Sequence, residues 1–165
     1  MHKPAPPWYR WLWISAVVVV LDLATKAWIT HTFQYNETLY ILPFFNLVLA
    51  HNTGAAFSFL ADAGGWQRWF FVTVTLLVAA VLLNMLRKHP GNRLLATALA
   101  LVLGGALGNL WDRATMGYVV DFVQVHYGGY YFPAFNVADS AITVGVVLLL
   151  LDSLRGEPKP QKETP

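Results

Sequence analysis

Long apolar runs alternate with shorter polar connections along this chain. A membrane-spanning helix needs about 20 mostly apolar residues, and four segments come close to that length and composition. They cover about 11–30, 69–86, 94–111 and 133–151. The pattern predicts an all-α integral membrane protein, with four transmembrane helices in a single membrane domain over 1–165.

The first apolar run is expected to stay in the protein as a helix rather than to be removed as a signal peptide. Asp22 and Lys26 interrupt it, and no small-residue cleavage site follows. The third run carries Gly104 and Gly108, four positions apart. Small residues at that spacing let neighbouring helices approach closely, which favours tight packing around this helix.

The two longer connections, about 31–68 and 112–135, contain strand patterns. The segment TLYILPFFNLVLAHN (38–52) is rich in strand-forming residues. The segment YVVDFVQVHYGGYYFPAF has two such runs around Gly128-Gly129, a typical two-residue hairpin turn. We therefore expect the two loops to form a small β-rich cap lying on the outer membrane surface.

Lysine and arginine are distributed unevenly between the two sides of the predicted membrane, eight against three. The eight are Lys3, Arg10, Arg87, Lys88, Arg93, Arg155, Lys159 and Lys162, and the three are Lys26, Arg68 and Arg113. Because cytoplasmic loops are enriched in these residues, we expect both termini in the cytoplasm and the β-rich cap on the extracytoplasmic side. The tail, about 155–165, is rich in proline and charge and is predicted to be disordered.

The composition agrees with a membrane protein and excludes several function classes. The chain is 56% hydrophobic and 12% charged, whereas soluble domains average about 25% charged residues. It has no cysteine, which excludes disulfides and thiolate chemistry. The five histidines lack metal-ligand spacing, and the net charge of +2 comes without a basic stripe. We expect no metal, no cofactor and no nucleic-acid partner.

Polar and ionisable side chains gather toward the extracytoplasmic ends of the predicted helices. Asp139 stands at the start of the last run, and Asn109 and Arg113 stand at the end of the third. Asp22 lies on the same side of the first run, and Asp121 precedes the last run in a loop that could fold back over it. Because ionisable residues are costly in a membrane, such a cluster indicates a functional site.

Several of these residues also have a purely structural interpretation. Asn136 and Asp139, three apart, match a helix N-cap followed by an acid at the third helical position, where the helix dipole favours negative charge. Asp121 could be a solvated strand residue. Asp22 and Lys26, four apart, fit an intrahelical ion pair. Similarly, the neighbours Asp112 and Arg113 fit a structural pair at a helix end.

A pair of aspartates offers one chemistry that needs neither metal nor cofactor. Two nearby carboxylates do not both ionise easily, so one keeps a proton while the other acts as base. The base takes a proton from water, the water attacks a peptide carbonyl, and the acid protonates the oxyanion or leaving amine. Asp121 and Asp139 are the candidates. Serine chemistry has less support, because Ser58 and Ser140 lack a GxSxG setting.

Five sequence blocks carry a resemblance to a known family. VVVVLDLATKAW, HNTGAAFSFL, GGALGNLWDR, GYVVDF and FNVADSAI occur in this order, and together they resemble the lipoprotein signal peptidases, also called signal peptidase II. The resemblance covers about 9–152. It implies a bacterial inner-membrane aspartic endopeptidase with four transmembrane helices, which removes signal peptides from prolipoproteins just before a diacylglyceryl-modified cysteine.

The resemblance also implies roles for individual residues and for partners. Asp121 of VVD and Asp139 of NVAD correspond to the catalytic pair. The supporting or substrate-contacting positions are Asn52, Asn109, Arg113, Asn136 and Asp22. The implied partners are diacylglyceryl-prolipoproteins, membrane lipid and inhibitors of the globomycin type, and we expect a monomer. A lipid-bearing cysteine presents its scissile bond at the outer headgroup level, where the polar residues gather, and the small residues of TGAAFS would let a substrate backbone come close.

Three other functions remain open from the residues alone. A small ion- or proton-coupled transporter could use Asp22 and Asp139 as a relay, but it predicts inverted repeats, and none is evident. A non-catalytic assembly factor would use the aspartates only as caps and pairs. A presenilin-like intramembrane protease would need a glycine-aspartate motif that the chain lacks. Replacing each aspartate by asparagine separates a structural cap from a catalytic group.

Overall fold

The computed structural model describes residues 6–54 and 64–155. A short 3-10 helix, η1 (Trp8–Trp11), leads into the first long helix, α1 (Leu12–Thr32). The other helices are α2 (Gln67–Lys88), α3 (Arg93–Thr115) and α4 (Val137–Arg155), and the strands are β1 (Thr38–Leu42), β2 (Phe45–Asn52), β3 (Val119–Tyr127) and β4 (Tyr130–Tyr131). The predicted disordered tail and most of TGAAFS lie outside the described residues.

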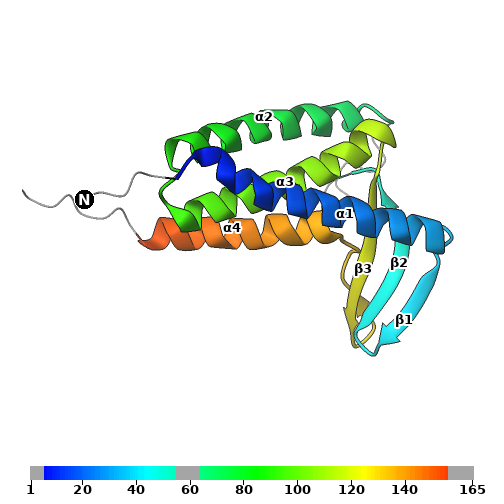
Figure 1. The fold of residues 1–165 in the computed structure, drawn as a ribbon. Helices are drawn as coiled ribbons and strands as arrows, with labels where there is room; N and C mark the ends of the chain where they lie inside the picture. Colours follow the sequence, from blue (N-terminus) through cyan, green and yellow to red (C-terminus); the bar gives the residue numbers. More distant parts are fainter. Residues whose placement is uncertain (1–5, 55–63, 156–165) are drawn as a thin grey trace, which may run out of the picture.

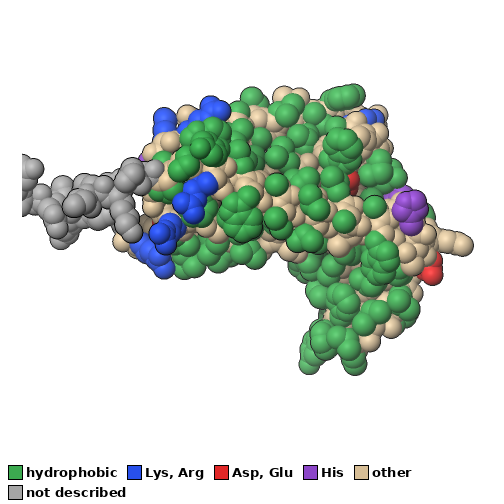
Figure 2. All heavy atoms as spheres, viewed as in Figure 1, with side chains coloured by type: hydrophobic (Ala, Val, Ile, Leu, Met, Phe, Trp, Pro, Cys, Tyr) green, Lys and Arg blue, Asp and Glu red, His purple; other side chains and the backbone are tan. Residues whose placement is uncertain are grey.

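Among the described residues, four helices are long and apolar enough to cross a membrane. They lie side by side, and the sheet stands at one end of them (Figure 1). The prediction of four membrane-capable helices is therefore confirmed, together with a small antiparallel sheet. In the surface view, hydrophobic side chains cover much of the helical face shown (Figure 2), as expected for helices that contact lipid.

Two predicted helix boundaries were wrong, each for a local reason. The third helix runs on to Thr115 rather than ending near 111, so Asp112 and Arg113 are helical. The fourth begins at Val137 rather than near 133. The preceding Phe135 exchanges backbone hydrogen bonds with Val123 of β3, and a backbone committed to a strand partner cannot also form the first helical turn.

The third helix is the centre of the bundle. The apolar window of α3 is 56% buried, compared with 17–28% for the other three helices. Its glycines allow this, because a Cβ on Gly104 would meet the Ser15 backbone of α1 at 2.9 Å, and one on Gly105 would collide with the Ala138 carbonyl oxygen of α4. The close packing indicated by the Gly104 and Gly108 spacing is therefore present.

The four strands form one antiparallel sheet in the order β1-β2-β3-β4. The predicted hairpin turn is present, with φ of 57° at Gly128 and 85° at Gly129. Positive φ at both central positions is the type I′ pattern that glycine favours. In the β2–β3 register, Ala50 lies opposite Asp121. The carboxylate of Asp121 accepts a hydrogen bond from Asn136, the residue directly before α4, so the sheet and the helices meet at this acid.

Gly108 gives a test of how tightly α1 and α3 must approach. A Cβ at this position would lie 2.5 Å from Oδ2 of Asp22, so Gly108→Ala should lower the free energy of unfolding by about 1–3 kcal/mol, the usual cost of overpacking. Thermal unfolding in detergent measures this. Ala80→Val, which adds more volume at an exposed position of α2, is the control and should unfold like the wild type. Equal unfolding temperatures for Gly108→Ala and wild type would contradict the packing argument.

Candidate active site

Asp121 and Asp139 meet where the sheet reaches the start of α4. Both carboxylates line one cavity of about 810 Å³. One wall comes from the end of β2 and from β3, and the other from the segment before α4 and its first two turns. The topology therefore brings together two acids that lie eighteen positions apart in the sequence, one from a strand and one from a helix.

Asp139 takes part in a reciprocal cap at the start of α4. Its backbone N–H donates to Oδ1 of Asn136 at 2.9 Å, and the backbone N–H of Asn136 donates to Oδ2 of Asp139 at 3.2 Å. The structural interpretation of these two residues as a capping box is therefore confirmed. It does not exclude a chemical role, because the half-buried carboxylate also faces the cavity.

Asp121 is buried, with only 3% of its surface exposed, so its interpretation as a solvated strand residue was wrong. Its carboxylate accepts hydrogen bonds from the side-chain amides of Asn136 at 2.7 Å and Asn52 at 3.1 Å. Burial, and then the nearby charge of Asp139, raise the pKa of Asp121 to about 7, although these two hydrogen bonds act in the opposite direction. This carboxyl therefore holds a proton far more readily than an ordinary aspartate.

Asn109 lies at the outer end of α3 and contacts the second acid. Its Nδ2 donates to Oδ1 of Asp139 at 2.8 Å. Its Oδ1 accepts from Nζ of Lys26 at 2.9 Å and from Nδ2 of Asn136 at 3.2 Å. The predicted polar residues Asn109 and Asn136 thus lie between the two acids and connect them through hydrogen bonds.

Asp22 holds α1 against the start of α4 and does not line the cavity. Its Oδ1 accepts the backbone N–H of Ala138 at 2.9 Å, and its Oδ2 lies 2.7 Å from Nζ of Lys26. The predicted intrahelical ion pair of Asp22 with Lys26 is confirmed. Asp22 also satisfies a backbone donor at a helix N-terminus, where four such groups lack helical partners, so its position is supporting.

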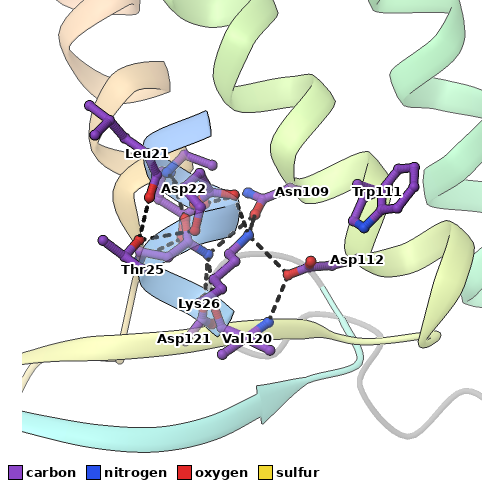
Figure 3. Close-up of polar contacts among 12 residues, drawn as sticks. Leu21, Asp22, Thr25, Lys26, Asn109, Trp111, Asp112, Val120 and Asp121 are labelled. Carbon is purple, nitrogen blue, oxygen red and sulfur yellow. Dashed lines mark hydrogen bonds and ion pairs between the residues drawn. The ribbon is translucent and has the colours of Figure 1, made fainter. Parts of the chain in front are cut away.

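The predicted pair of Asp112 with Arg113 was wrong. Asp112 instead lies 2.9 Å from Nζ of Lys26 and accepts the backbone N–H of Val120 at 3.1 Å. Figure 3 shows Lys26 reaching from α1 to Asp22, Asn109 and Asp112. Neighbouring residues on a helix point in different directions, so the contact partners of Asp112 come from other elements.

Arg113 lies on the other side of α3 and contacts the chain that follows β2. Its Nη2 donates to the carbonyl oxygen of Gly54 at 2.7 Å, and its guanidinium stands 5.1 Å from the centre of the Phe71 ring. Its Nε is buried and has no hydrogen-bond partner among the described residues. Asn52, two residues before Gly54, accepts the backbone N–H of Gly54 at 3.0 Å, so Arg113 and Asn52 meet at one turn.

Comparisons with known proteins agree with this arrangement. The family described as Signal peptidase (SPase) II matches residues 14–155. The chain belongs to the signal peptidase II family. A lipoprotein signal peptidase of Janthinobacterium sp. (strain Marseille) is 54% identical over 145 residues, covering 88% of each chain. One of Pseudomonas putida is 53% identical over 150 residues, covering 89% of this chain and 88% of the relative.

Solved structures give the same result for the fold. A bacterial membrane enzyme, solved at 2.3 Å by the in meso method, superposes with a TM-score of 0.84 at 33% identity, covering 100% of this chain and 98% of the other. The expected function, removal of the signal peptide from prolipoproteins by a membrane aspartic protease of the bacterial inner membrane, is confirmed by this family membership. The transporter and assembly-factor alternatives have no such support.

Three residues in or beside this cavity received no functional interpretation from the sequence. Lys26 and Asp112 appeared only as members of local ion pairs. His51, on β2, lines the cavity and stacks on Tyr118, with ring centres 4.0 Å apart, and burial lowers the pKa of its imidazole. For Lys26 and Asp112 the available signal was a charge within or at the end of an apolar run, whereas His51 was marked only as the first residue of the block HNTGAAFSFL.

The raised pKa of Asp121 predicts a pH dependence of stability. The folded state binds this proton more tightly than an unfolded chain, in which the ordinary pKa is 3.8. The stabilisation is therefore complete below about pH 4 and is lost as the pH rises to about 7. We expect the wild-type unfolding temperature to fall from about pH 5 to about pH 8 by more than that of Asp121→Asn.

Thermal unfolding in one detergent at both pH values measures this difference. Asp152→Asn is the control, because it removes a carboxylate near the opposite end of α4 and leaves the Asp121–Asp139 pair intact. An equal change of unfolding temperature with pH in wild type and Asp121→Asn would show that Asp121 does not hold its proton in the folded protein.

Proposed function

We propose that Asp121 and Asp139 are the catalytic pair of this signal peptidase. They cut the prolipoprotein immediately before its diacylglyceryl-modified cysteine. The observation that carries the proposal is the shared cavity: two carboxylates from different elements line it, and Asn136 donates one hydrogen bond to each of them. Two carboxylates that line one cavity in this way can share a single proton.

The raised pKa of Asp121 supports one division of roles between the two acids. Near pH 7 Asp121 retains its proton more readily than an ordinary aspartate, so it acts as the acid and Asp139 acts as the base. Asp139 takes one proton from a water, whose oxygen bonds to the scissile carbonyl carbon, while Asp121 gives its proton to the carbonyl oxygen. The tetrahedral intermediate then collapses: the C–N bond breaks, Asp139 returns its proton to the leaving amine, and Asp121 recovers one from the intermediate hydroxyl.

The supporting residues have distinct parts in this proposal. Asn109 and Asn136 orient the carboxylates, and Asp22 holds the start of α4 in place. Arg113 and Asn52 contact the substrate or its developing oxyanion, and the unpartnered Nε of Arg113 supports this role. A guanidinium and an amide are suited to hold a carbonyl or a lipid ester.

The shape and lining of the cavity support a lipid-modified substrate. Beyond the two acids, apolar side chains such as Phe132, Phe135, Ile142 and Val144 line it. The cavity therefore offers a polar end for the peptide bond and an apolar wall for acyl chains. Inhibitors of the globomycin type would compete for the same cavity, and a monomer is sufficient because all proposed catalytic groups come from one chain.

We propose that the sheet end of the bundle faces outward from the cytoplasm. The described cations Arg10, Arg87, Lys88, Arg93 and Arg155 belong to the opposite end, where α1 begins and α4 ends (Figures 1 and 2). This uneven charge favours a cytoplasmic location for that end. The sheet then forms an extracytoplasmic cap, and its exposed aromatic tip, which includes Tyr127 and Tyr130, rests at the outer membrane surface.

Replacement of either acid by asparagine tests the catalytic pair. Asp121→Asn and Asp139→Asn should each reduce cleavage of a diacylglyceryl-prolipoprotein by about 10³-fold or more, and the double variant should be scarcely worse, because the two act as one unit. Wild-type activity should follow a bell-shaped pH profile and be insensitive to chelators. A mobility shift assay with purified protein measures cleavage.

The control for this experiment is Asp152→Asn, which changes an acid outside the cavity and should cleave like the wild type. A folded single variant of the pair that still cleaves near the wild-type rate would reduce that aspartate to a helix cap or a structural strand residue.

The substrate assignment predicts a requirement for the lipid. A precursor without diacylglycerol lacks the group that places its scissile bond at the headgroup level, so kcat/KM should fall by about 10²-fold or more. Parallel assays of lipidated and unlipidated forms of one precursor measure this. Equal rates for the two forms would rule out the proposed recognition of lipid.

The proposed orientation can be tested with single cysteines, because the chain has none of its own. Lys88→Cys places a thiol at an exposed position at the end of α2, and Tyr130→Cys places one at an exposed position of the sheet, in β4. In spheroplasts, a membrane-impermeant thiol reagent should label Tyr130→Cys directly and Lys88→Cys only after disruption. The reverse pattern would invert the topology.

A further inference from the structure

Lys26 is the hub of the buried polar network. It comes from the middle of an apolar helix, and only 3% of its surface is exposed. Its Nζ lies 2.7 Å from Oδ2 of Asp22, 2.9 Å from Oδ2 of Asp112 and 2.9 Å from Oδ1 of Asn109. These partners belong to two helices, α1 and α3, and Figure 3 shows them converging on the ammonium group.

The chemistry of the ammonium group determines how the amide of Asn109 is oriented. An ammonium has three N–H donors and no acceptor, so the side of the amide that faces Lys26 must be the oxygen. The amide nitrogen therefore faces the other way, where it donates to Oδ1 of Asp139 at 2.8 Å. Lys26 does not line the cavity, yet it determines which atom Asn109 presents to an acid that does.

A second path leads from Lys26 toward Asp121. Asp112, held by the ammonium, accepts the backbone N–H of Val120 at 3.1 Å, and Val120 directly precedes Asp121 on β3. The charge of Lys26 also acts through space, because it lowers the pKa of Asp121 against the larger effects of burial and of Asp139. Among the described residues, Arg113 and Asp112 of α3 are further charged groups near Asp121.

We propose that Lys26 is a positioning residue for the reaction: it locks the amide of Asn109 with its nitrogen toward Asp139, so that Asp139 keeps a donated hydrogen bond while it acts as base. This inference rests on the proposed catalytic pair and adds a residue to it. The competing explanation is that Lys26 only neutralises Asp22 and Asp112. That role requires a charge, whereas the positioning role requires an N–H donor directed at Asn109.

A matched pair of variants separates the two explanations. Both carry Asp22→Asn and Asp112→Asn, which remove the buried charges but keep oxygen acceptors for the backbone N–H groups of Ala138 and Val120. One then has Lys26→Gln and the other Lys26→Met. The two side chains have similar length and volume, and only glutamine can donate to Asn109.

The positioning role predicts a difference in kcat between these variants. The Lys26→Met chain should turn over about tenfold or more slowly than the Lys26→Gln chain, with the same KM, because a misplaced catalytic group costs up to about 10²-fold. The two chains carry the same charges around Asp121, so their pH profiles should coincide, and the difference in kcat then reports the N–H donor alone. Equal kcat in two folded chains would overturn the proposal.

A second measurement keeps Lys26 and its ion pairs intact. Asn109→Leu removes the path from Lys26 to Asp139, so kcat should fall about tenfold or more. When Asn109→Leu is instead added to the two matched variants described above, Met and Gln at position 26 should give the same kcat. Wild-type turnover by Asn109→Leu would overturn the proposal even if the variants at position 26 fail to fold.

Ser15→Ala is the control, since it removes a buried contact between the same two helices, from Ser15 Oγ to the carbonyl oxygen of Ala100 at 2.7 Å. It should lower stability without changing kcat or the pH profile. The catalytic pair itself is judged separately by Asp121→Asn and Asp139→Asn, so failure of the positioning role cannot be mistaken for failure of the proposed function.

Discussion

The charges buried at the junction of α1, α3, α4 and the sheet must be neutralised by one another. Burying an unpaired charge costs several kcal/mol, and a buried pair is tolerated only when its remaining atoms are also satisfied. Lys26 meets this condition with Asp22 and Asp112, whose other hydrogen bonds hold the start of α4 and the start of β3. The contacts that satisfy the charges therefore also join the helices to the strand that carries Asp121.

Close helix packing is what makes those contacts possible. The carboxylate of Asp22 occupies the space that a side chain on Gly108 would fill, and the Ala138 carbonyl occupies the space beside Gly105. If α3 carried larger residues, the helices α1 and α4 would lie farther from it. Lys26 of α1 could then not reach Asn109. The small residues of α3 therefore affect the candidate site by setting the spacing between helices, although none of them lines the cavity.

Three asparagines present N–H donors to the pair of acids, and each is oriented by a donor bound to its oxygen. Asn136 accepts from the backbone of Asp139 and donates to Asp121. Asn52 accepts from a backbone N–H and also donates to Asp121, while Asn109 accepts from a lysine and donates to Asp139. Fixed donors of this kind stabilise a carboxylate without the reorganisation that water would need. Those of Asn52 and Asn136 counteract the burial that raises the pKa of Asp121.

The sequence by itself determined the features that depend on residues close together in the chain. Apolar runs of spanning length predicted the four helices, Gly128-Gly129 predicted the hairpin, and spacings of three and four predicted the cap at Asp139 and the pair of Asp22 with Lys26. Only the tertiary structure decided that Asp112 pairs with Lys26 rather than with its neighbour, and that Asp121 is buried. The physical reason is range: helical periodicity and capping act within one turn, whereas the partners of a buried charge are chosen by which elements pack together.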